Sequence, residues 1–281
     1  MKIDLNTLSI FDFNVHLPIG KNDLDLKHFE DLTMDIDQIN NAINYYKSDL
    51  KILDGANYML FNQDITEEEL FHEKMSNLRE NISNKSTFTL LLDFRKSNIK
   101  EHMAIAKKSG VKGIKFHSYI QKIEEKDFET IINLCVYAEE LGMFICIDAS
   151  YGTIFLYKYD NLKLAASIAQ EVKKTPIILL HSGGSRVLEA MLIADMQENI
   201  YLETSLTIPF YNGSNLWKDL AFCYKKLNCD RVLYATDFPY VSLTNSLKTH
   251  KNFFENFDFT TDEINKITSL NALKLLSSLN L

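Results

Sequence analysis

The chain has 281 residues, of which 46% are hydrophobic, 11% aromatic and 24% charged, and this balance excludes a disordered, collagenous or low-complexity chain. Thirty Lys and Arg against 38 Asp and Glu give a net charge of -8, and the basic residues are spread singly along the sequence. A nucleic-acid or anionic-membrane surface is therefore not expected.

Short β-branched or aromatic runs alternate with stretches of helical periodicity along the chain. The predicted strands are 9–16, 55–62, 87–93, 112–117, 143–149, 176–181, 199–205 and 231–237. The predicted helices are 97–109, 126–141, 160–174, 185–197, 214–227 and 261–278, while 20–53 and 64–84 are longer connections of helix plus loop. This alternation is typical of parallel strands joined by crossover helices.

Eight strands with eight helical partners predict an α/β fold, the (β/α)8 TIM barrel. A doubly wound open sheet is the alternative, but such sheets usually carry a glycine fingerprint after the first strand. The adjacent glycines here are Gly183 and Gly184, after the sixth strand. Since no linker or repeat divides the sequence, residues 1–281 are expected to form a single domain, with C-terminal helices from about residue 242.

The cysteines and the N-terminus bear on the compartment. The four cysteines form no C-x-x-C pair, and three of them lie in apolar stretches, so they predict reduced core residues rather than a disulfide frame. The sequence starts without the apolar run of a signal peptide and contains no segment near the ~18 apolar residues of a membrane span. We therefore expect a cytoplasmic protein.

Polar side chains stand where the predicted strands end, and this is the rim on which barrels of this kind build their active sites. These residues are Asp12, Asn14, His16, Lys115, His117, Asp148, His181, Glu203, Ser205 and Asp237. Residues two apart on a strand share a face, so Asn14 pairs with His16 and Lys115 with His117. An imidazole, two carboxylates and an amide oxygen converging at the mouth would suit one divalent cation. A structural, hydrogen-bonded role is the alternative for any single one of these residues.

Six motifs, in the right order along nearly the whole chain, resemble those of the amidohydrolase superfamily, most closely its amidohydrolase-related (amidohydrolase 2) branch of small hydrolases and decarboxylases. The motifs are Asp12-Phe13-Asn14-Val15-His16 for the D-x-H-x-H that ends strand one, Gly113-Ile114-Lys115-Phe116-His117 for strand four, Leu180-His181-Ser182-Gly183-Gly184 for strand six, Tyr201-Leu202-Glu203-Thr204-Ser205 for strand seven, Thr236-Asp237-Phe238-Pro239 for strand eight, and Asn271-Ala272 with Leu275 for the C-terminal N-A-x-x-L helix.

The resemblance implies one divalent metal ion at the mouth. Its ligands, carried over by position, are His16, Asp237, Asp148, Asn14 and His181. Asn14 and Asp148 depart from the family pattern, because each stands where a histidine is expected. Zinc is the first choice, and the oxygen-rich donors leave manganese or magnesium as alternatives. Loss of the metal is the remaining alternative.

The resemblance also implies roles for individual residues. Asp237 and His181 are the predicted catalytic residues, the first accepting the proton of a water and the second polarising a carbonyl or protonating a leaving group. The predicted substrate-binding residues are His117 and Lys115 together with Arg95, Arg186 and Tyr151, the last three chosen because they follow strand ends. Solvated arginines and ordinary core packing of Tyr151 are the alternatives. For Lys115, a carbamylated bridging ligand and a buried salt bridge remain open. Asp12 is expected to orient its neighbours.

The leading functional hypothesis is a metal-dependent hydrolase that attacks a C=O centre (amide, lactone or ester) of a small, carboxylated substrate. One alternative is a metal-dependent, non-oxidative decarboxylase of a small acid. Another is a catalytically silent barrel that binds a ligand. The expected partner is a small-molecule substrate, without nucleic acid or membrane, and a homodimer is a candidate assembly.

Overall fold

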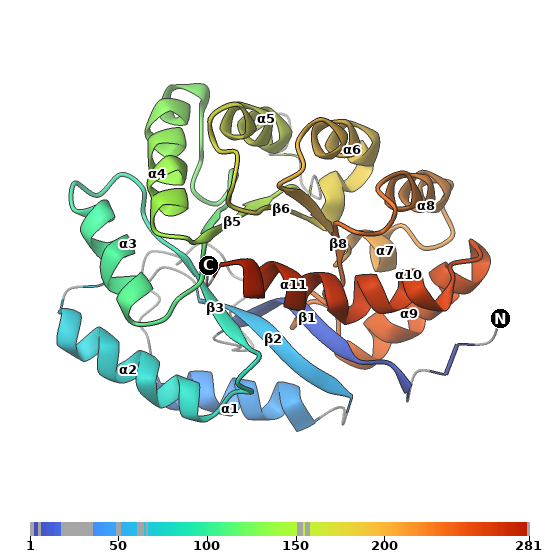
Figure 1. Cartoon of the computed structure of the whole chain (residues 1–281), viewed down its shortest axis with the longest axis horizontal. Coiled ribbons are helices and arrows are strands. Elements are labelled where there is room, and N and C mark those ends of the chain that lie inside the picture. Colours follow the sequence, from blue (N-terminus) through green and yellow to red (C-terminus); the bar gives the residue numbers. More distant parts are fainter. Residues whose placement is uncertain are drawn as a thin grey trace.

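The eight apolar runs of the sequence form one sheet of parallel strands that pair in chain order, β1 to β8 (Figure 1). The computed structural model describes residues 3–4, 7–17, 36–48, 52–60, 65, 67–150, 154 and 158–279. The strands are β1 (Ile10–Leu17), β2 (Leu53–Leu60), β3 (Thr87–Leu91), β4 (Gly113–Phe116), β5 (Phe144–Asp148), β6 (Ile177–Leu180), β7 (Ile200–Glu203) and β8 (Val232–Leu233). Most are buried throughout, as expected for strands covered on both faces.

The helices follow the strands in alternation. They are α1 (Ile36–Ser48), α2 (Glu68–Glu80), α3 (Ile99–Lys108), α4 (Phe128–Glu140), α5 (Asn161–Glu171), α6 (Val187–Met196), α7 (Thr207–Phe210), α8 (Leu216–Lys226), α9 (Leu243–Asn256), α10 (Thr261–Asn265) and α11 (Asn271–Ser278). Local chemistry sets several ends: the Asp160 carboxylate caps α5 by accepting from the Lys163 amide, and Thr260 and Glu263 form a capping box at α10. None of the described helices is long and apolar enough to cross a membrane.

The sheet closes on itself almost completely. The Phe13 amide of β1 donates to the Tyr234 carbonyl at 3.0 Å, and the Asp237 amide donates to the Asn14 carbonyl at 3.0 Å. These bonds join β1 to the segment that continues β8, so the predicted single-domain TIM barrel is confirmed. The predicted eighth strand, 231–237, is shortened to Val232–Leu233.

Two apolar clusters form the core. The larger one fills the layer between the strands and the surrounding helices. The smaller one lies inside the barrel, where Phe11, Phe13 and Phe144 pack with Ala272 and Leu275 of α11. Helix α11 therefore closes the end of the barrel at which the strands begin, and it crosses the front of the barrel in Figure 1. The opposite end, where the strands finish, is left for chemistry.

Candidate active site at the barrel mouth

A bulge in β1 turns Asn14 and His16 toward the barrel interior. The register of β1 against β2 shifts between Asp12 and Val15. Before the shift Phe13 belongs to the inner cluster, whereas after it Val15 packs in the outer layer. The residues on either side of Val15 therefore point inward, as a bulge next to an active site commonly arranges. Strict alternation from Phe13 would have placed both side chains outside the barrel.

The backbone is strained at two of the predicted catalytic residues. His181 has a φ of 61° and Asp237 a φ of 63°, in the left-handed region that side chains other than glycine seldom adopt. The segment after His181 turns sharply through Ser182, Gly183 and Gly184, all with positive φ. These turns end β6 and the continuation of β8, and they hold both side chains at the mouth.

The first group of polar side chains centres on Asp237. Its Oδ1 lies 3.1 Å from His16 Nε2 and accepts a hydrogen bond of 3.1 Å from Asn14 Nδ2. Lys115 Nζ lies 3.4 Å from the same His16 Nε2, on a side chain that is 1% exposed. Asn14 Oδ1 is buried and has no hydrogen-bond partner. One carboxylate, one imidazole, one amide and one buried amine thus meet on this side of the mouth.

The second group centres on Asp148. Its Oδ2 is shared by two imidazoles, with His181 Nε2 at 3.2 Å and His117 Nε2 at 3.3 Å. Its Oδ1 accepts from the Ser150 hydroxyl at 2.8 Å and from the Ser150 amide at 3.2 Å. Since His117 Nε2 faces the carboxylate, its Nδ1 is left as a buried atom without a partner.

Ser205 connects the two groups, a role that the sequence analysis did not assign. Its hydroxyl donates to Glu203 Oε2 at 2.8 Å, so it accepts from Asn14 Nδ2 at 3.2 Å and from His181 Nδ1 at 3.1 Å. The Ser205 carbonyl also faces His181 Nδ1, at 3.2 Å. The signal for this role was present in the sequence, because Glu203 and Ser205 end the seventh predicted strand two residues apart.

The electrostatics make His181 the acid of the mouth. Burial alone would lower the pKa of His181, but the carboxylates of Asp237, Asp148 and Glu203 raise that pKa to about 9. Burial works against ionisation of Asp148 and Asp237 too, yet the neighbouring imidazoles hold the pKa of both carboxyls below the usual value. At neutral pH His181 is therefore an imidazolium that contacts the Asp148 carboxylate and is stabilised by the charge of Asp237. Glu203 differs, since burial raises its pKa to about 7.

The other two imidazoles of the mouth are neutral at pH 7. Burial lowers the pKa of His117 to about 3, although the Asp148 carboxylate opposes this shift. Burial and the Lys115 ammonium lower the pKa of His16, against the attraction of Asp237. The cationic groups of the mouth are thus His181 and Lys115, and the anionic groups are Asp148, Asp237 and the partly ionised Glu203.

Asp12 supports the strand ends from outside the barrel. It accepts hydrogen bonds from Tyr46 Oη and Thr236 Oγ1, both at 2.6 Å, and from the Thr236 and Asn14 amides at 3.0 and 3.2 Å. Burial raises the pKa of Asp12 to about 6, and these hydrogen bonds oppose the rise. The carboxylate therefore ties the end of β1 to the segment that carries Asp237.

The five predicted metal ligands share the mouth, but they do not surround one point. In the part of the chain that the structure describes, which includes all five, no three His, Cys, Asp or Glu side chains are grouped as a metal site requires. Asp148 is saturated by two imidazoles and Ser150, and Asn14 turns its NH2 group, a donor, toward Asp237. Lys115 approaches the imidazole nitrogen that would bind the ion. As they stand, these donors do not fit a divalent ion.

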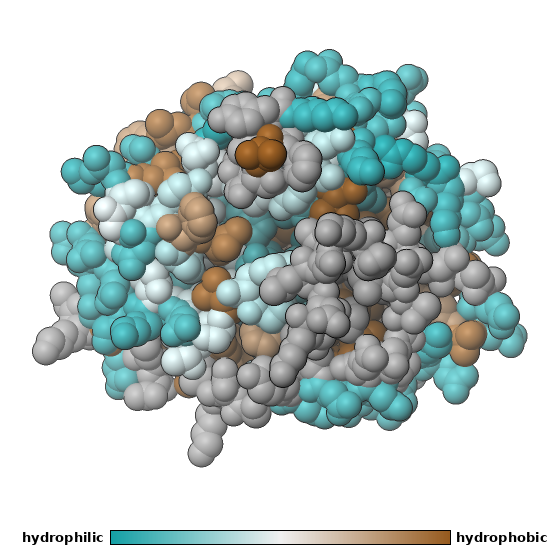
Figure 2. Space-filling model, turned by 180° about the vertical axis from the view of Figure 1, so that it is seen from behind, coloured by the Kyte–Doolittle hydropathy of each residue, from teal (hydrophilic) through white to brown (hydrophobic). Residues whose placement is uncertain are grey.

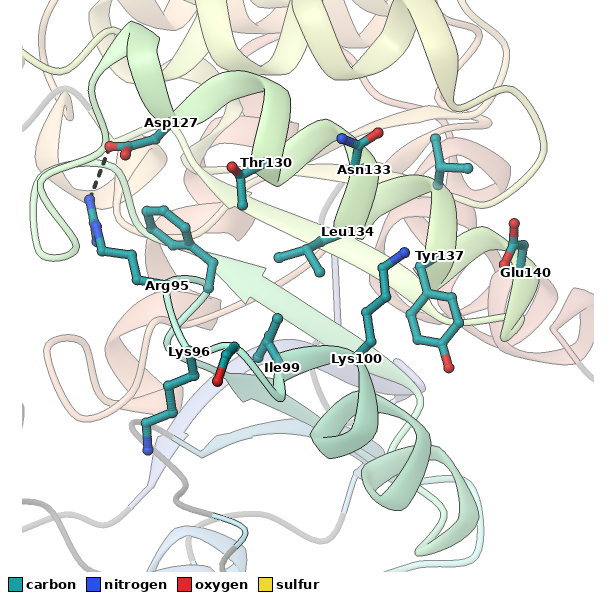
Figure 3. Close-up of a pocket in the computed structure, with 13 residues that line it drawn as sticks. Arg95, Lys96, Ile99, Lys100, Asp127, Thr130, Asn133, Leu134, Tyr137 and Glu140 are labelled. Atoms are coloured by element: carbon teal, nitrogen blue, oxygen red, sulfur yellow. Dashed lines mark hydrogen bonds and ion pairs between the residues drawn. The ribbon is translucent and has the colours of Figure 1, made fainter.

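The two predicted substrate-binding arginines pair with carboxylates outside the cluster, although Arg95 also lines the cavity beside the mouth. Arg95 pairs with Asp127 at 3.0 Å in an open hollow of about 660 Å³ between α3 and α4, outside the barrel (Figure 3). Arg186 binds both carboxylate oxygens of Asp160 at 3.1 Å and also pairs with Glu189. Tyr151 lies outside the described residues. Lys115 and His117, in contrast, are part of the cluster.

A cavity of about 450 Å³ adjoins the mouth above the ends of β3 and β4. Gln121, in its wall, accepts from the His117 amide at 3.0 Å and donates to the Leu92 carbonyl at 2.9 Å, which joins the wall to the cluster. Its charged lining residues are Asp93, Arg95, Lys122, Glu124, Lys126 and Lys158.

Figure 2 shows the face of the molecule opposite that of Figure 1, where hydrophilic side chains gather along much of the outline.

Comparison with solved structures supports the fold across the whole chain. An uncharacterised TIM-barrel protein of Bordetella bronchiseptica aligns with a TM-score of 0.70 at 13% identity, covering 98% of this chain and 100% of that one. A probable 2-pyrone-4,6-dicarboxylic acid hydrolase of Acinetobacter baumannii, with citric acid bound, aligns with a TM-score of 0.61 at 10% identity, covering 96% and 100%. A dihydroxybenzoic acid decarboxylase of Polaromonas, with manganese and the inhibitor 2-nitroresorcinol bound, aligns at 0.54 and 14% identity, covering 98% of each chain.

The sequence itself matches a family model. Residues 88–277, which include β3 to β8 and the helices between them, match the model described as amidohydrolase. A search of curated proteins finds no match. The family match spans more than half of the chain and covers Lys115, Asp148, His181 and Asp237. This chain therefore belongs to the amidohydrolase family.

Proposed function

We propose that the chain is an enzyme that hydrolyses a C=O centre, in an amide, lactone or ester, of a small carboxylated substrate. The observation that carries the proposal is the imidazolium of His181, which contacts the Asp148 carboxylate at 3.2 Å and is also stabilised by the charge of Asp237. An acid and a base at one buried mouth are what addition of water to a carbonyl and expulsion of its leaving group require. The family and the solved neighbours, which include a hydrolase, support an enzyme.

In the proposed reaction the Asp237 carboxylate removes a proton from water, and the hydroxide attacks the carbonyl carbon. In the resting site the Nε2 proton of His181 is directed at Asp148 Oδ2, which orients the ring and stabilises its charge. His181 polarises the carbonyl and, as the C–N or C–O bond breaks, this Nε2 proton leaves its hydrogen bond with Asp148 and passes to the leaving nitrogen or oxygen. The proton taken by Asp237 returns to His181, so the net change is the addition of one water.

The divalent ion expected from the sequence, zinc or else manganese or magnesium, stays a prediction. Manganese is bound to the Polaromonas decarboxylase, so the fold can hold a metal. The donors of this mouth do not fit such an ion as they stand. The proposed reaction therefore uses only the side chains of the protein.

Charge at the mouth supports an anionic substrate. The Lys115 amine is buried beside His16, and the adjoining cavity is lined by four cationic and two acidic side chains. Lys126 and Lys158 pair with Glu124, at 2.7 and 3.5 Å, which leaves Lys122 among the cations that face the cavity. A carboxylate on the substrate would be attracted by this field.

Decarboxylation of a small acid is the second candidate. The observation that favours it is the same protonated His181, because loss of carbon dioxide leaves a carbanion that a positioned acid must protonate. Solved neighbours include decarboxylases for 2,6-dihydroxybenzoate and 5-carboxyvanillate. The products separate the two reactions.

The test is a product assay with lactones, amides, esters and aromatic acids that each bear a carboxylate. The proposal expects a new carboxyl group, which titration of the released acid detects. It expects no carbon dioxide, which infrared spectroscopy of the gas would detect. Carbon dioxide from an aromatic acid, without cleavage of any lactone or amide, would replace hydrolysis by decarboxylation. Binding without turnover across the collection would favour the silent barrel.

The proposed location is the cytoplasm. All four cysteines, at positions 135, 146, 223 and 229, are free and buried, and burial raises the pKa of each thiol. Unpaired thiols of this kind are usual in a reducing compartment.

The proposed assembly is a homodimer, and an apolar stripe on α6 supports it. Leu188, Leu192 and Met196 follow at intervals of four residues and are 45%, 59% and 78% exposed, and Phe222 of the neighbouring α8 is 55% exposed. A twofold axis would cover the stripe with α8 of a second copy. Exposed Asp195 on α6 and the exposed lysines of α8, at 218 and 226, are complementary in charge for that arrangement.

Introducing charge into this stripe is expected to release monomers. Wild-type protein should elute in light-scattering chromatography at twice its chain mass of 32.5 kDa. The variant Leu192→Glu/Met196→Glu should elute at the mass of one chain. In a twofold dimer each introduced carboxylate would be buried against apolar side chains of the other copy, and this costs more free energy than the interface provides. Leu70→Glu, which changes an exposed leucine of α2, is the matched control and should leave the dimer intact. A monomeric wild type would contradict the assignment.

A further inference from the structure

The mouth contains a buried cation whose role the proposed reaction leaves open. Lys115 comes from β4, is 1% exposed, and is among the largest side chains that are almost completely buried. A lysine in such a place is rare unless its charge is compensated. Its Nζ lies 3.4 Å from His16 Nε2, and its charge acts on both Asp148 and Asp237.

The position of this amine coincides with the ligand side of His16. The Nε2 atom that a metal would use lies 3.1 Å from Asp237 Oδ1 and 3.4 Å from Lys115 Nζ. An ion bound by His16 and Asp237 would therefore have the buried Lys115 amine as a close neighbour, and the two like charges would repel. Lys115 and a divalent cation thus compete for the same attraction to Asp237.

The remaining ligand candidates are mostly engaged by other groups of the mouth. A metal would need a third and a fourth ligand, but Asn14 presents its NH2 group to Asp237, and Asp148 binds His181, His117 and Ser150. A divalent ion would have to displace these contacts and share the Asp237 carboxylate with the buried Lys115 amine.

We propose that the Lys115 ammonium takes the place of a divalent ion at this mouth, so that the chain works on its substrate with no bound metal. Lys115 then provides the fixed positive charge that holds a substrate oxygen, either of a carboxylate or of the carbonyl under attack. The inference rests on the proposed function only in taking this mouth as the site of reaction. It assigns the absence of metal to one residue, which makes it testable without knowing the substrate.

The test measures metal in the whole protein, purified without chelators, by plasma mass spectrometry and by calorimetric titration with Zn²⁺ and Mn²⁺. Wild type is expected to carry less than stoichiometric metal and to give no saturable binding. Lys115→Arg, which keeps the charge, should behave in the same way. Lys115→Met/Asn14→His, which removes the cation and restores a second imidazole, should gain saturable binding of Zn²⁺ by at least about tenfold over Asn14→His alone.

Several outcomes would overturn the inference. One is a wild type that holds one ion per chain, and another is binding by Asn14→His as tight as that by the double variant. Two ions per chain in bicarbonate, with a carbamylated Lys115 seen by carbon-13 NMR, would also contradict it. Thermal melts confirm that each variant is folded, and Lys115→Gln replaces the methionine variant if the latter does not fold. Whichever of these two variants folds, the metal content of the wild type and of Lys115→Arg decides whether the inference stands.

The result is independent of the proposed reaction. A metal-containing wild type that cleaves a lactone would overturn the role of Lys115 and leave hydrolysis standing. A metal-free wild type that only releases carbon dioxide would support the role of Lys115 and overturn hydrolysis. Metal-free hydrolysis that survives a chelator and is lost in Lys115→Met supports both.

Discussion

Replacement of His181 by glutamine is expected to lower kcat by about 10²–10⁴-fold, the range over which a positioned general acid acts. The imidazolium is the proposed proton donor, and glutamine can still accept or donate a hydrogen bond at Ser205 but has no proton to give. Because the carboxylates around it raise the pKa of His181 to about 9, the wild-type rate should fall as pH rises through that value. The measurement is the pH profile of kcat on the best substrate of the product assay.

His102→Gln is the matched control. His102 is also buried, at 5% exposure, but it lies on α3, where its Nε2 is 2.8 Å from Asn98 Nδ2. Its replacement should change kcat by less than about threefold, since it lies on α3 in the outer layer of helices and not at a strand end. A His181→Gln enzyme that keeps the wild-type rate and the wild-type alkaline limb would remove the acid from the proposed reaction.

The barrel could be predicted from the sequence because its strands are buried on both faces. Each of the eight predicted strands overlaps an observed one, and the match is good where an apolar run is bounded by turns, as in 143–149 against Phe144–Asp148. The eighth strand shows the limit. Its second half reads as strand, but Thr236 turns to hydrogen bond with Asp12 and Asp237 has a positive φ, so the ladder ends at Leu233.

The candidate site was predicted in its membership more than in its connections. Positions at strand ends predict that Asn14, His16, Asp148, His181 and Asp237 share the mouth, and the structure places all five there. The β-bulge that turns Asn14 and His16 into the barrel contains no glycine or proline from which it could be predicted. Nor could periodicity reveal that Asp148 would bind two imidazoles from different strands, because such pairing depends on the radius of the barrel and on side-chain length.

The arginines also show that the sequence predicts the position of a side chain better than its contacts. Arg95 and Arg186 stand just past strand ends in sequence, as substrate-binding residues would. In the structure each finds a carboxylate of its own neighbourhood, Asp127 or Asp160, at 3.0–3.1 Å. Local sequence gives the position of a side chain along the rim, whereas its direction is decided by partners that come from other elements.

The folded state should lose stability between pH 7 and 9 because of His181. Its pKa is raised from 6.5 to about 9 on folding, so its contribution is complete below about pH 6.5 and is lost as pH rises through 9. The shift corresponds to on the order of 3 kcal/mol, of which roughly 2 kcal/mol disappears between pH 7 and 9. The measurement is the free energy of unfolding from urea titrations at pH 7, 8 and 9, for wild type and for His181→Gln.

The comparison between the two proteins isolates the proton of His181 together with the titration of Glu203, whose pKa of about 7 is held down by the charge of His181. His16 and His117 have lowered pKa values, so they are neutral in both the folded and the unfolded chain above pH 7 and add no slope. The buried thiols do weaken stability as pH approaches 9, but they are the same in both proteins and cancel in the difference. The gap between wild type and His181→Gln should therefore shrink by roughly 2 kcal/mol from pH 7 to pH 9. A gap that stays constant would mean that His181 is neutral at pH 7, and with it the acid of the proposed reaction would be lost.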